Sequence, residues 1–288
     1  MLEGQAFQQH PETRFESGDA KGADSALCTP RQNHLLAALP LEDYERLLPN
    51  LKPVPLPLGW TIHGPGDPET GLYFLTAGIA ARFCLTANGA SAASAVTGNE
   101  GVIGVASFLG GIRTPCQAVV LSAGHAYRLG AQALDREFKH DDALHRLLLR
   151  YTQGLIMQTM RTAACNRHHS VEQQVCRWIL SCMDRLPSNE LTMTQERIAG
   201  MLGVRREGVT EAARNLQKAG LIHTHRGHIA VLDRSRLEAL ACECYAANKR
   251  EYARSLPGTL QPKAAISLRP AKFERITQKC AARARAAA

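Results

Sequence analysis

The chain has 288 residues, of which 45% are hydrophobic, so it is long enough for about two domains and too apolar to be wholly disordered. The formal net charge of +8 lies entirely in residues 246–288, which carry 10 basic and 2 acidic groups, and it therefore says little about the folded domains. The N-terminus is polar, which argues against a signal peptide, and no apolar run reaches about 18 residues, which argues against a membrane span. The nine cysteines form no CxxC pair and do not suggest a secreted disulfide framework. We therefore expect a cytoplasmic protein.

The first half of the chain predicts a small antiparallel domain. Residues 1–30 mix Gly, Pro, Ser and charge, and we expect them to be disordered. We assign residues 31–140 to one domain, which begins with a short helix over about 32–48. Short apolar stretches then alternate with Gly- and Pro-containing turns, which is typical of a β-barrel or sandwich. The strand-like stretches are Leu72–Leu75, Ile79–Leu85 and Ala118–Leu121.

A long helix is predicted over about 141–164, within a segment that we bound at 141–166. Its apolar positions recur at helical spacing and are widened by further apolar residues. Such a wide stripe either covers the chain's own domain or also meets the same helix of a second chain. The stripe consists of Leu144, Leu148, Tyr151 and Leu155, widened by Leu147, Ile156 and Met160.

The next domain, 167–245, contains a predicted helix-turn-helix. It opens with Ser170-x-x-Gln173, a capping-box pattern. Thr194 is placed to cap a short helix, and Gly203 stands where that helix must stop and turn. A second helix is predicted over 205–219. Two helices joined by a short Gly-containing turn are typical of DNA-binding proteins.

The second helix has an apolar side and a charged side. Val209, Ala212, Ala213 and Leu216 fall on one side, and the polar residues face away from it. The candidate DNA-binding residues are Arg205, Arg206, Glu207, Thr210, Glu211, Arg214 and Lys218. In a recognition helix the first turn lies nearest the bases, so Arg206 suits guanine, Glu207 suits cytosine, and Arg214 and Lys218 suit phosphate. The alternative is a helical hairpin with a solvated charged face.

A hairpin follows this helix. Leu221–Thr224 and His228–Leu232 are strand-like and flank Arg226-Gly227, which is a turn signal. A helix-turn-helix followed by such a hairpin is a winged form, and we expect Arg226 at the wing tip to lie near phosphate.

In the order of these parts, and in the stretch TQERIAGMLGVRREGV, residues 32–245 resemble the Crp–Fnr superfamily of bacterial regulators. The resemblance implies an α+β fold with a β-roll sensor domain, a long dimerisation helix and a C-terminal winged helix-turn-helix. It further implies a homodimer through helix 141–164 that binds two-fold symmetric double-stranded DNA, with RNA polymerase and a small-molecule effector as further candidate partners. Arg206 and Glu207 match the family's recognition helix, whereas Thr210 and Glu211 stand where Ser and Arg are usual.

The sensor region departs from the family's cyclic-nucleotide cassette. The similar stretch places Gly104 and Val105 where the cassette has Gly-Glu, and Arg113-Thr114 follows at a shorter spacing. The side chain of valine cannot accept a hydrogen bond from the ribose. These four residues remain the candidate ligand-binding residues, but we expect the domain to bind no cyclic nucleotide or to bind a different ligand. Only Cys28 lies in the N-terminal region where iron–sulfur members gather cysteines, and we expect no cofactor.

Other chemistry is weakly supported. The wing histidines His223, His225 and His228 lack a Cys or acidic companion, and we expect no metal site. A redox or metal switch near the domain joint is an alternative to buried structural cysteines. The residues concerned are Cys165, His168, His169, Cys176 and Cys182.

No catalytic motif occurs, so we expect no enzyme, and turnover in the sensor pocket remains a minor alternative. A stronger rival is a ligand-binding β-roll that regulates a protein partner. Residues 246–288 are predicted to form a largely disordered basic tail that adds attraction to phosphate.

Overall fold

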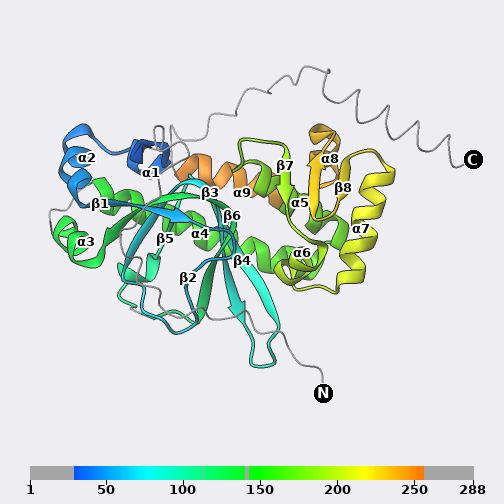
Figure 1. The fold of residues 1–288 in the computed structure, drawn as a ribbon, viewed down its shortest axis with the longest axis horizontal. Coiled ribbons are helices and arrows are strands. Elements are labelled where there is room, and N and C mark those ends of the chain that lie inside the picture. The colour runs from blue at the N-terminus through cyan, green and yellow to red at the C-terminus, as the bar shows by residue number, and fades with distance from the viewer. Residues whose placement is uncertain (1–28, 112, 140–142, 256–288) are drawn as a thin grey trace, which may run out of the picture.

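The computed structural model describes residues 29–111, 113–139 and 143–255. Predictions for residues 1–28 and 256–288 lie outside the described residues. Figure 1 shows the strands of the N-terminal half gathered on one side with helix α4 running along them, helices α5 to α8 on the other side, and helix α9 near the middle of the view.

The single short helix predicted over about 32–48 is divided into several short helical elements in the structure. The side chain of Asn33, which is fully buried, organises them: its oxygen accepts from the backbone N–H of Leu35 and Leu36, and its amide donates to the carbonyls of Leu75 and Gly101, at 2.8 Å each. The elements are the 3-10 turns Pro30–Gln32 and Leu48–Asn50 and the helices α1 (His34–Ala37) and α2 (Leu41–Leu47).

A six-stranded antiparallel sheet forms the N-terminal domain. Strands β1, β6, β3 and β4 are neighbours in that order, while β2 pairs with β6 and β5 pairs with β3. This confirms the predicted antiparallel β-roll. The strands are β1 (Leu51–Leu56), β2 (Thr61–His63), β3 (Gly71–Leu85), β4 (Ser91–Thr97), β5 (Val102–Ile103) and β6 (Cys116–Gly130), with a 3-10 turn at Val105–Ser107 before β6.

The prediction of separate strands at Leu72–Leu75 and Ile79–Leu85 was wrong, because both belong to β3. The chain passes between them through Gly78 at φ +84°, where the pairing with β6 shifts register. A Cβ at Gly78 would lie 2.6 Å from the carbonyl oxygen of Ser122, so glycine alone allows the two strands to stay paired here.

Helix α3 (Ala131–Phe138) leads to α4 (Ala143–His168), which is longer at its C-terminal end than predicted. The predicted apolar stripe is buried within this chain, as the positions of Leu144, Leu148, Tyr151 and Leu155 show. A separate face of α4 exposes Leu149, Ile156 and Met160. The face of α4 that covers its own domain therefore differs from the face that is free to meet a second chain.

The C-terminal half contains the predicted helix-turn-helix and wing. The capping box at Ser170 is present, with Gln173 N–H donating to the Ser170 hydroxyl and the Gln173 side chain accepting from the Ser170 N–H. Strand β7 adds a third strand to the wing, in the order β7-β9-β8. The elements are α5 (Val171–Met183), β7 (Glu190–Thr192), α6 (Gln195–Leu202), α7 (Arg206–Lys218), β8 (Ile222–His225), β9 (His228–Val231) and α8 (Arg234–Leu240).

The predicted start of a disordered tail at residue 246 was wrong for residues 246–255, which form most of α9 (Glu243–Ser255). This helix packs on α4 and buries Tyr252, whose hydroxyl donates to Gln158 Oε1 at 2.8 Å. The basic composition of the tail hid a large aromatic anchor, Tyr252. No helix in the described parts of the chain is long and apolar enough to cross a membrane.

One hydrophobic core joins the two halves. Ile79, Phe83 and Val119 of the sheet share it with residues of α5 and α6 such as Ile179 and Met201. The helix-turn-helix is thus packed directly on the tip of the β-roll rather than separated from it by a solvated linker.

Candidate nucleic-acid interface

Helix α6 begins and ends where the sequence predicts. The Thr194 hydroxyl accepts from the backbone N–H of Arg197 at 3.2 Å, which satisfies one free donor of the first turn. At the other end Gly203 has φ +67°, a left-handed conformation that lets the chain turn sharply into α7. The apolar side of α6, including Ile198 and Leu202, is buried.

Helix α7 lies with its apolar side on the rest of the domain. Val209, Ala212, Ala213 and Leu216 are all buried, as its periodicity predicts. Two side-chain contacts fix the helix further: Asn215 donates to Glu172 of α5, and Gln217 accepts from Thr224 of the wing. Its position is therefore set by packing on both α5 and β8.

The opposite side of α7 is open to solvent. Arg205 occupies the position before the first helical residue and makes no capping hydrogen bond from its side chain. Every charged candidate on this helix is exposed. They are Arg205, Arg206, Glu207, Glu211, Arg214 and Lys218. The face therefore presents four cations and two carboxylates, with both signs already present in the first turn.

Thr210 lies at the border of this exposed side. It is half-buried, and its hydroxyl lies 2.8 Å from Gln195 Oε1 and 3.0 Å from the carbonyl oxygen of Arg206. Helical projection gives the side of α7 on which Thr210 lies, but not its contact with Gln195, the first residue of α6. Gln195, which the sequence analysis did not single out, thus borders the exposed face of α7.

The wing turns through Arg226 and Gly227, both at positive φ (44° and 80°), which fits a tight hairpin. Arg226 is exposed at the tip. The backbone N–H of Met193 donates to the carbonyl of Gly227 at 2.6 Å, which ties the tip to the start of α6. A groove of about 320 Å³ lies between the first turn of α6, Arg206 and the wing. The wing histidines His223, His225 and His228 are exposed.

The sensor candidates occupy two neighbouring segments. Gly104 has φ +108°, and a Cβ there would lie 2.1 Å from the carbonyl oxygen of Gly71, so this position requires glycine. Val105 packs against the hydrophobic cluster around α4. Arg113 donates to the carbonyl of Gly66 at 2.6 Å, and the Thr114 carbonyl accepts from the Gly66 N–H. Arg113 thus braces a loop in this structure.

A buried carboxylate lies beside this region. Glu69 Oε2 accepts from the backbone N–H of Ala106 at 2.8 Å, and Glu69 Oε1 lies 3.3 Å from His63 Nε2. Burial lowers the pKa of His63, although Glu69 opposes that shift. The pair could not be identified from the sequence, because its members lie outside the stretch that resembles the cassette.

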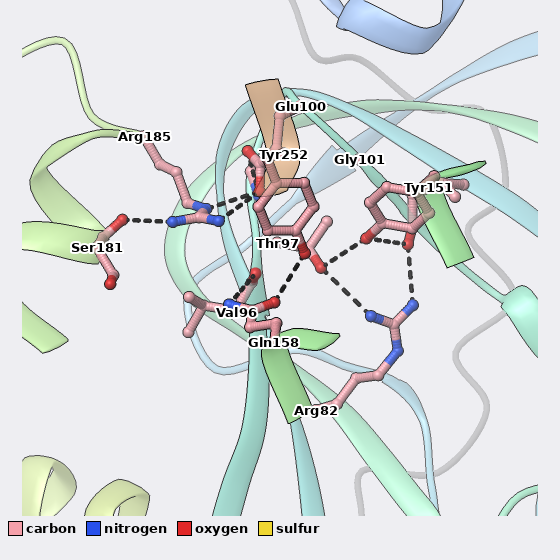
Figure 2. A network of polar contacts seen from close by, with 12 residues as sticks. Arg82, Val96, Thr97, Glu100, Gly101, Tyr151, Gln158, Ser181, Arg185 and Tyr252 are labelled. Atoms are coloured by element: carbon pink, nitrogen blue, oxygen red, sulfur yellow. Dashed lines mark hydrogen bonds and ion pairs between the residues drawn. The ribbon is translucent and has the colours of Figure 1, made fainter. Parts of the chain in front are cut away.

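A polar network connects the sheet with α4, α5 and α9 (Figure 2). Arg82 donates to Thr97 and to the carbonyl of Val102, and Tyr151 donates to the same carbonyl at 3.1 Å. Across the domain joint, Arg185 forms an ion pair with Glu100, with 2.7 Å between Nη2 and Oε1. The network holds the C-terminal domain to the β-roll through directional contacts as well as apolar packing.

Comparison with known proteins agrees with this architecture. A model of the Crp-like helix-turn-helix domain matches residues 173–240, and a model of the cyclic nucleotide-binding domain matches residues 53–141. No protein with a curated description matches the chain by sequence.

Solved structures share the fold. A Crp/Fnr-family protein from Eubacterium rectale is 24% identical, with a TM-score of 0.55, over 72% of this chain and 96% of its own. FixK2 from Bradyrhizobium japonicum is 18% identical, with a TM-score of 0.56, over 67% and 98%. A Crp-family regulator from Thermus thermophilus is 23% identical, with a TM-score of 0.55, over 66% and 96%.

A sensor-type β-roll joined to a Crp-like helix-turn-helix defines the class: this is a DNA-binding transcription regulator. The chain belongs to the Crp–Fnr superfamily.

Proposed function

We propose that the chain acts as a homodimer that recognises a two-fold symmetric DNA site, with one α7 helix in the major groove of each half-site. The observation that carries this proposal is the division of α7 into a fully packed inner side and an exposed outer side that begins with Arg206. A helix held in this way can enter a groove without rearranging its own domain.

The exposed residues divide between bases and backbone. Arg206 and Glu207, in the first turn, are placed for guanine and cytosine edges. Arg214 and Lys218, two to three turns further on, and Arg226 on the wing are placed for phosphates. Glu211 repels phosphate, so we expect it to face a base donor and to make the half-site differ from those of family members with arginine there.

The outer face of α4 supports dimerisation. Leu149, Ile156 and Met160 are 46%, 49% and 61% exposed. Together with Gln153 and Ala163 they follow alternating spacings of four and three residues, which is the seam pattern of two paired helices. Pairing along this seam would bury the exposed apolar side chains and place two α7 helices on one face of DNA, about 34–36 Å apart for successive major grooves.

For the sensor domain we propose that it does not hold a cyclic nucleotide in the family's manner. Val105 offers no hydrogen-bond acceptor from its side chain, and it packs against the hydrophobic cluster around α4. Arg113 is engaged with the Gly66 carbonyl. An effector of different chemistry, and contact with RNA polymerase, complete the proposed set of partners.

The test is selection of bound sequences from random double-stranded DNA with the full chain. We expect an enriched two-fold symmetric site. The variant Arg206→Ala should relax preference at one base position and weaken specific binding by about 1–3 kcal/mol, whereas Lys218→Ala should weaken all sequences alike. If Arg206→Ala weakens all sequences uniformly, the assigned base contact is wrong.

Dimerisation is tested separately by light scattering coupled to size exclusion. Ile156→Glu should yield a monomer that binds the full site weakly, because the charge lies on the proposed seam. Leu232→Glu, at a leucine of similar exposure (44%) outside α4, should remain dimeric. A monomeric wild-type chain would contradict the proposal.

The rival, a β-roll that regulates a protein partner, predicts no enriched DNA sequence. A truncation of segment 256–288 can distinguish general attraction to phosphate from recognition of the DNA sequence, because this segment carries 7 basic and 1 acidic residues. Truncation after Ser255, which retains α9, should flatten the salt dependence of binding and leave the selected sequence unchanged.

A further inference from the structure

Four metal-binding side chains from distant parts of the sequence meet at the domain joint. Cys165, His169, Cys242 and Cys244 each direct one ligand atom into the group, and all four atoms lie within 4.8 Å of one another. We propose that these residues form a zinc site that clamps the end of α4 to the start of α9.

The local backbone explains how each ligand is placed. Cys165 and His169 are one helical turn apart at the end of α4, and the backbone N–H of His169 donates to the Cys165 carbonyl at 3.0 Å. They therefore face the same side. Cys242 immediately precedes α9, and Cys244 is in its first turn. Two ligand pairs thus approach from elements separated by 77 residues.

The distances suit one tetrahedral ion. Zn–S bonds of about 2.3 Å and Zn–N bonds of about 2.0–2.1 Å place ligand atoms about 3.5–3.8 Å apart. In this structure Cys165 Sγ lies 3.5 Å from Cys242 Sγ, and Cys244 Sγ lies 3.7 Å from His169 Nδ1. Three sulfurs and one imidazole form a closed donor set that favours Zn²⁺ over harder cations and leaves no open position for catalysis.

The histidine also has the partner that a metal ligand needs on its other side. His169 Nε2 lies 3.3 Å from Glu243 Oε1, so the ring points Nδ1 at the sulfurs and Nε2 at a carboxylate. Such a carboxylate fixes the tautomer and makes the ligating nitrogen more basic. Cysteines that serve only as small apolar core residues have no need of an oriented imidazole.

Burial fits the same role. The three thiols are at most 6% exposed, and the His169 side chain at 19% forms the edge through which an ion could enter. His168, the next residue, is exposed and takes no part in the group.

The first measurement uses the wild-type full chain, purified with a thiol reductant and without chelator. We expect one zinc per chain by elemental analysis. After removal of zinc, titration with Co²⁺ should give the intense visible bands of a tetrahedral ion and a thiolate charge-transfer band, both saturating at one equivalent. A chain with neither zinc nor this spectrum, or with a Cys165–Cys242 disulfide under reducing conditions, would overturn the proposal.

Matched variants assign the ligands. Cys242→Ser and His169→Asn should abolish or strongly alter the Co²⁺ spectrum. His168→Asn, at the exposed neighbour, and Cys182→Ser, at a buried thiol outside the group, should leave the spectrum intact. An unchanged spectrum in His169→Asn would refute the assignment.

Glu243→Gln keeps the fold, because the side chain is 78% exposed, and tests the supporting carboxylate. We expect zinc affinity to fall about tenfold, measured by competition with a chromophoric chelator. Zinc should also raise the melting temperature of the wild-type chain but not of His169→Asn. None of these measurements depends on DNA binding, so the zinc site can be tested independently of the proposed function.

Discussion

The buried ion pair between Arg185 and Glu100 is expected to make the joint between the two domains sensitive to the loss of either partner alone. Arg185 Nε and Nη2 lie 2.8 Å and 2.7 Å from Glu100 Oε1, and Arg185 Nη1 donates to the Ser181 carbonyl at 2.7 Å. The two side chains are only 10% and 6% exposed. The variant Arg185→Met fills similar space but leaves the carboxylate buried, with the backbone N–H of Gly98 as its remaining hydrogen-bond donor among the described residues.

Loss of one partner of a buried pair costs about 3–5 kcal/mol, because the remaining charge is uncompensated. At about 2–4 °C per kcal/mol for a chain of this size, the melting temperature should fall by roughly 6–20 °C. The double variant Arg185→Met/Glu100→Gln should lose clearly less than the sum of the single changes, since it removes the stranded charge.

Urea unfolding measures this loss with a probe in each domain, because Trp60 lies by the β-roll core and Trp178 lies in α5. Arg254→Met is the control: Arg254 pairs with Glu251 but is 77% exposed, so its removal should cost no more than about 0.5 kcal/mol. Equal losses in Arg185→Met and Arg254→Met, or additive effects in the double variant, would refute the reasoning.

Three further changes test local features by thermal or urea unfolding. Gly203→Ala places a β-carbon at φ +67° and 3.3 Å from the Ala92 side chain, and should lower the free energy of unfolding by about 1–2 kcal/mol. Gly220→Ala, at φ +72° but with open space around the β-carbon, should lower it less. An equal loss in the two variants would show that the interdomain contact at Gly203 has no effect. Ser170→Ala removes the capping box of α5 and should cost about 1 kcal/mol, while Ser170→Gly should cost only a few tenths. Because burial lowers the pKa of His63, unfolding takes up a proton there; stability should decline as pH falls below about 6.5, and His63→Asn should flatten that decline.

Local signals predicted the parts of the interface that depend on near neighbours in sequence. The caps at Ser170 and Thr194, the left-handed Gly203 and the inner side of α7 follow from short-range rules, and the structure has each of them. Thr210 escaped the same rules, because its environment depends on Gln195, 15 residues away. Helical projection gives the side of a helix but not what lies over it.

Long-range contacts explain the features that the sequence analysis missed. Residues 246–255 read as part of a basic tail because their charges dominate the composition, yet the burial of Tyr252 against α4 makes them a helix. Cys165 and His169 drew notice near the domain joint, but their companions lie more than 70 residues later. Such a group appears only once α9 is placed on α4.

The packing between the two domains also bears on how they can move. α6 contacts β4 directly, and the hydrophobic core runs without interruption from the sheet into α5 and α6. A rotation of the helix-turn-helix relative to the β-roll would have to uncover that core and separate Arg185 from Glu100. Well-packed interfaces resist gradual deformation and change between discrete arrangements. A signal from the sensor domain must therefore supply enough binding energy to break this joint, or must act on an α7 that already lies in the arrangement described here.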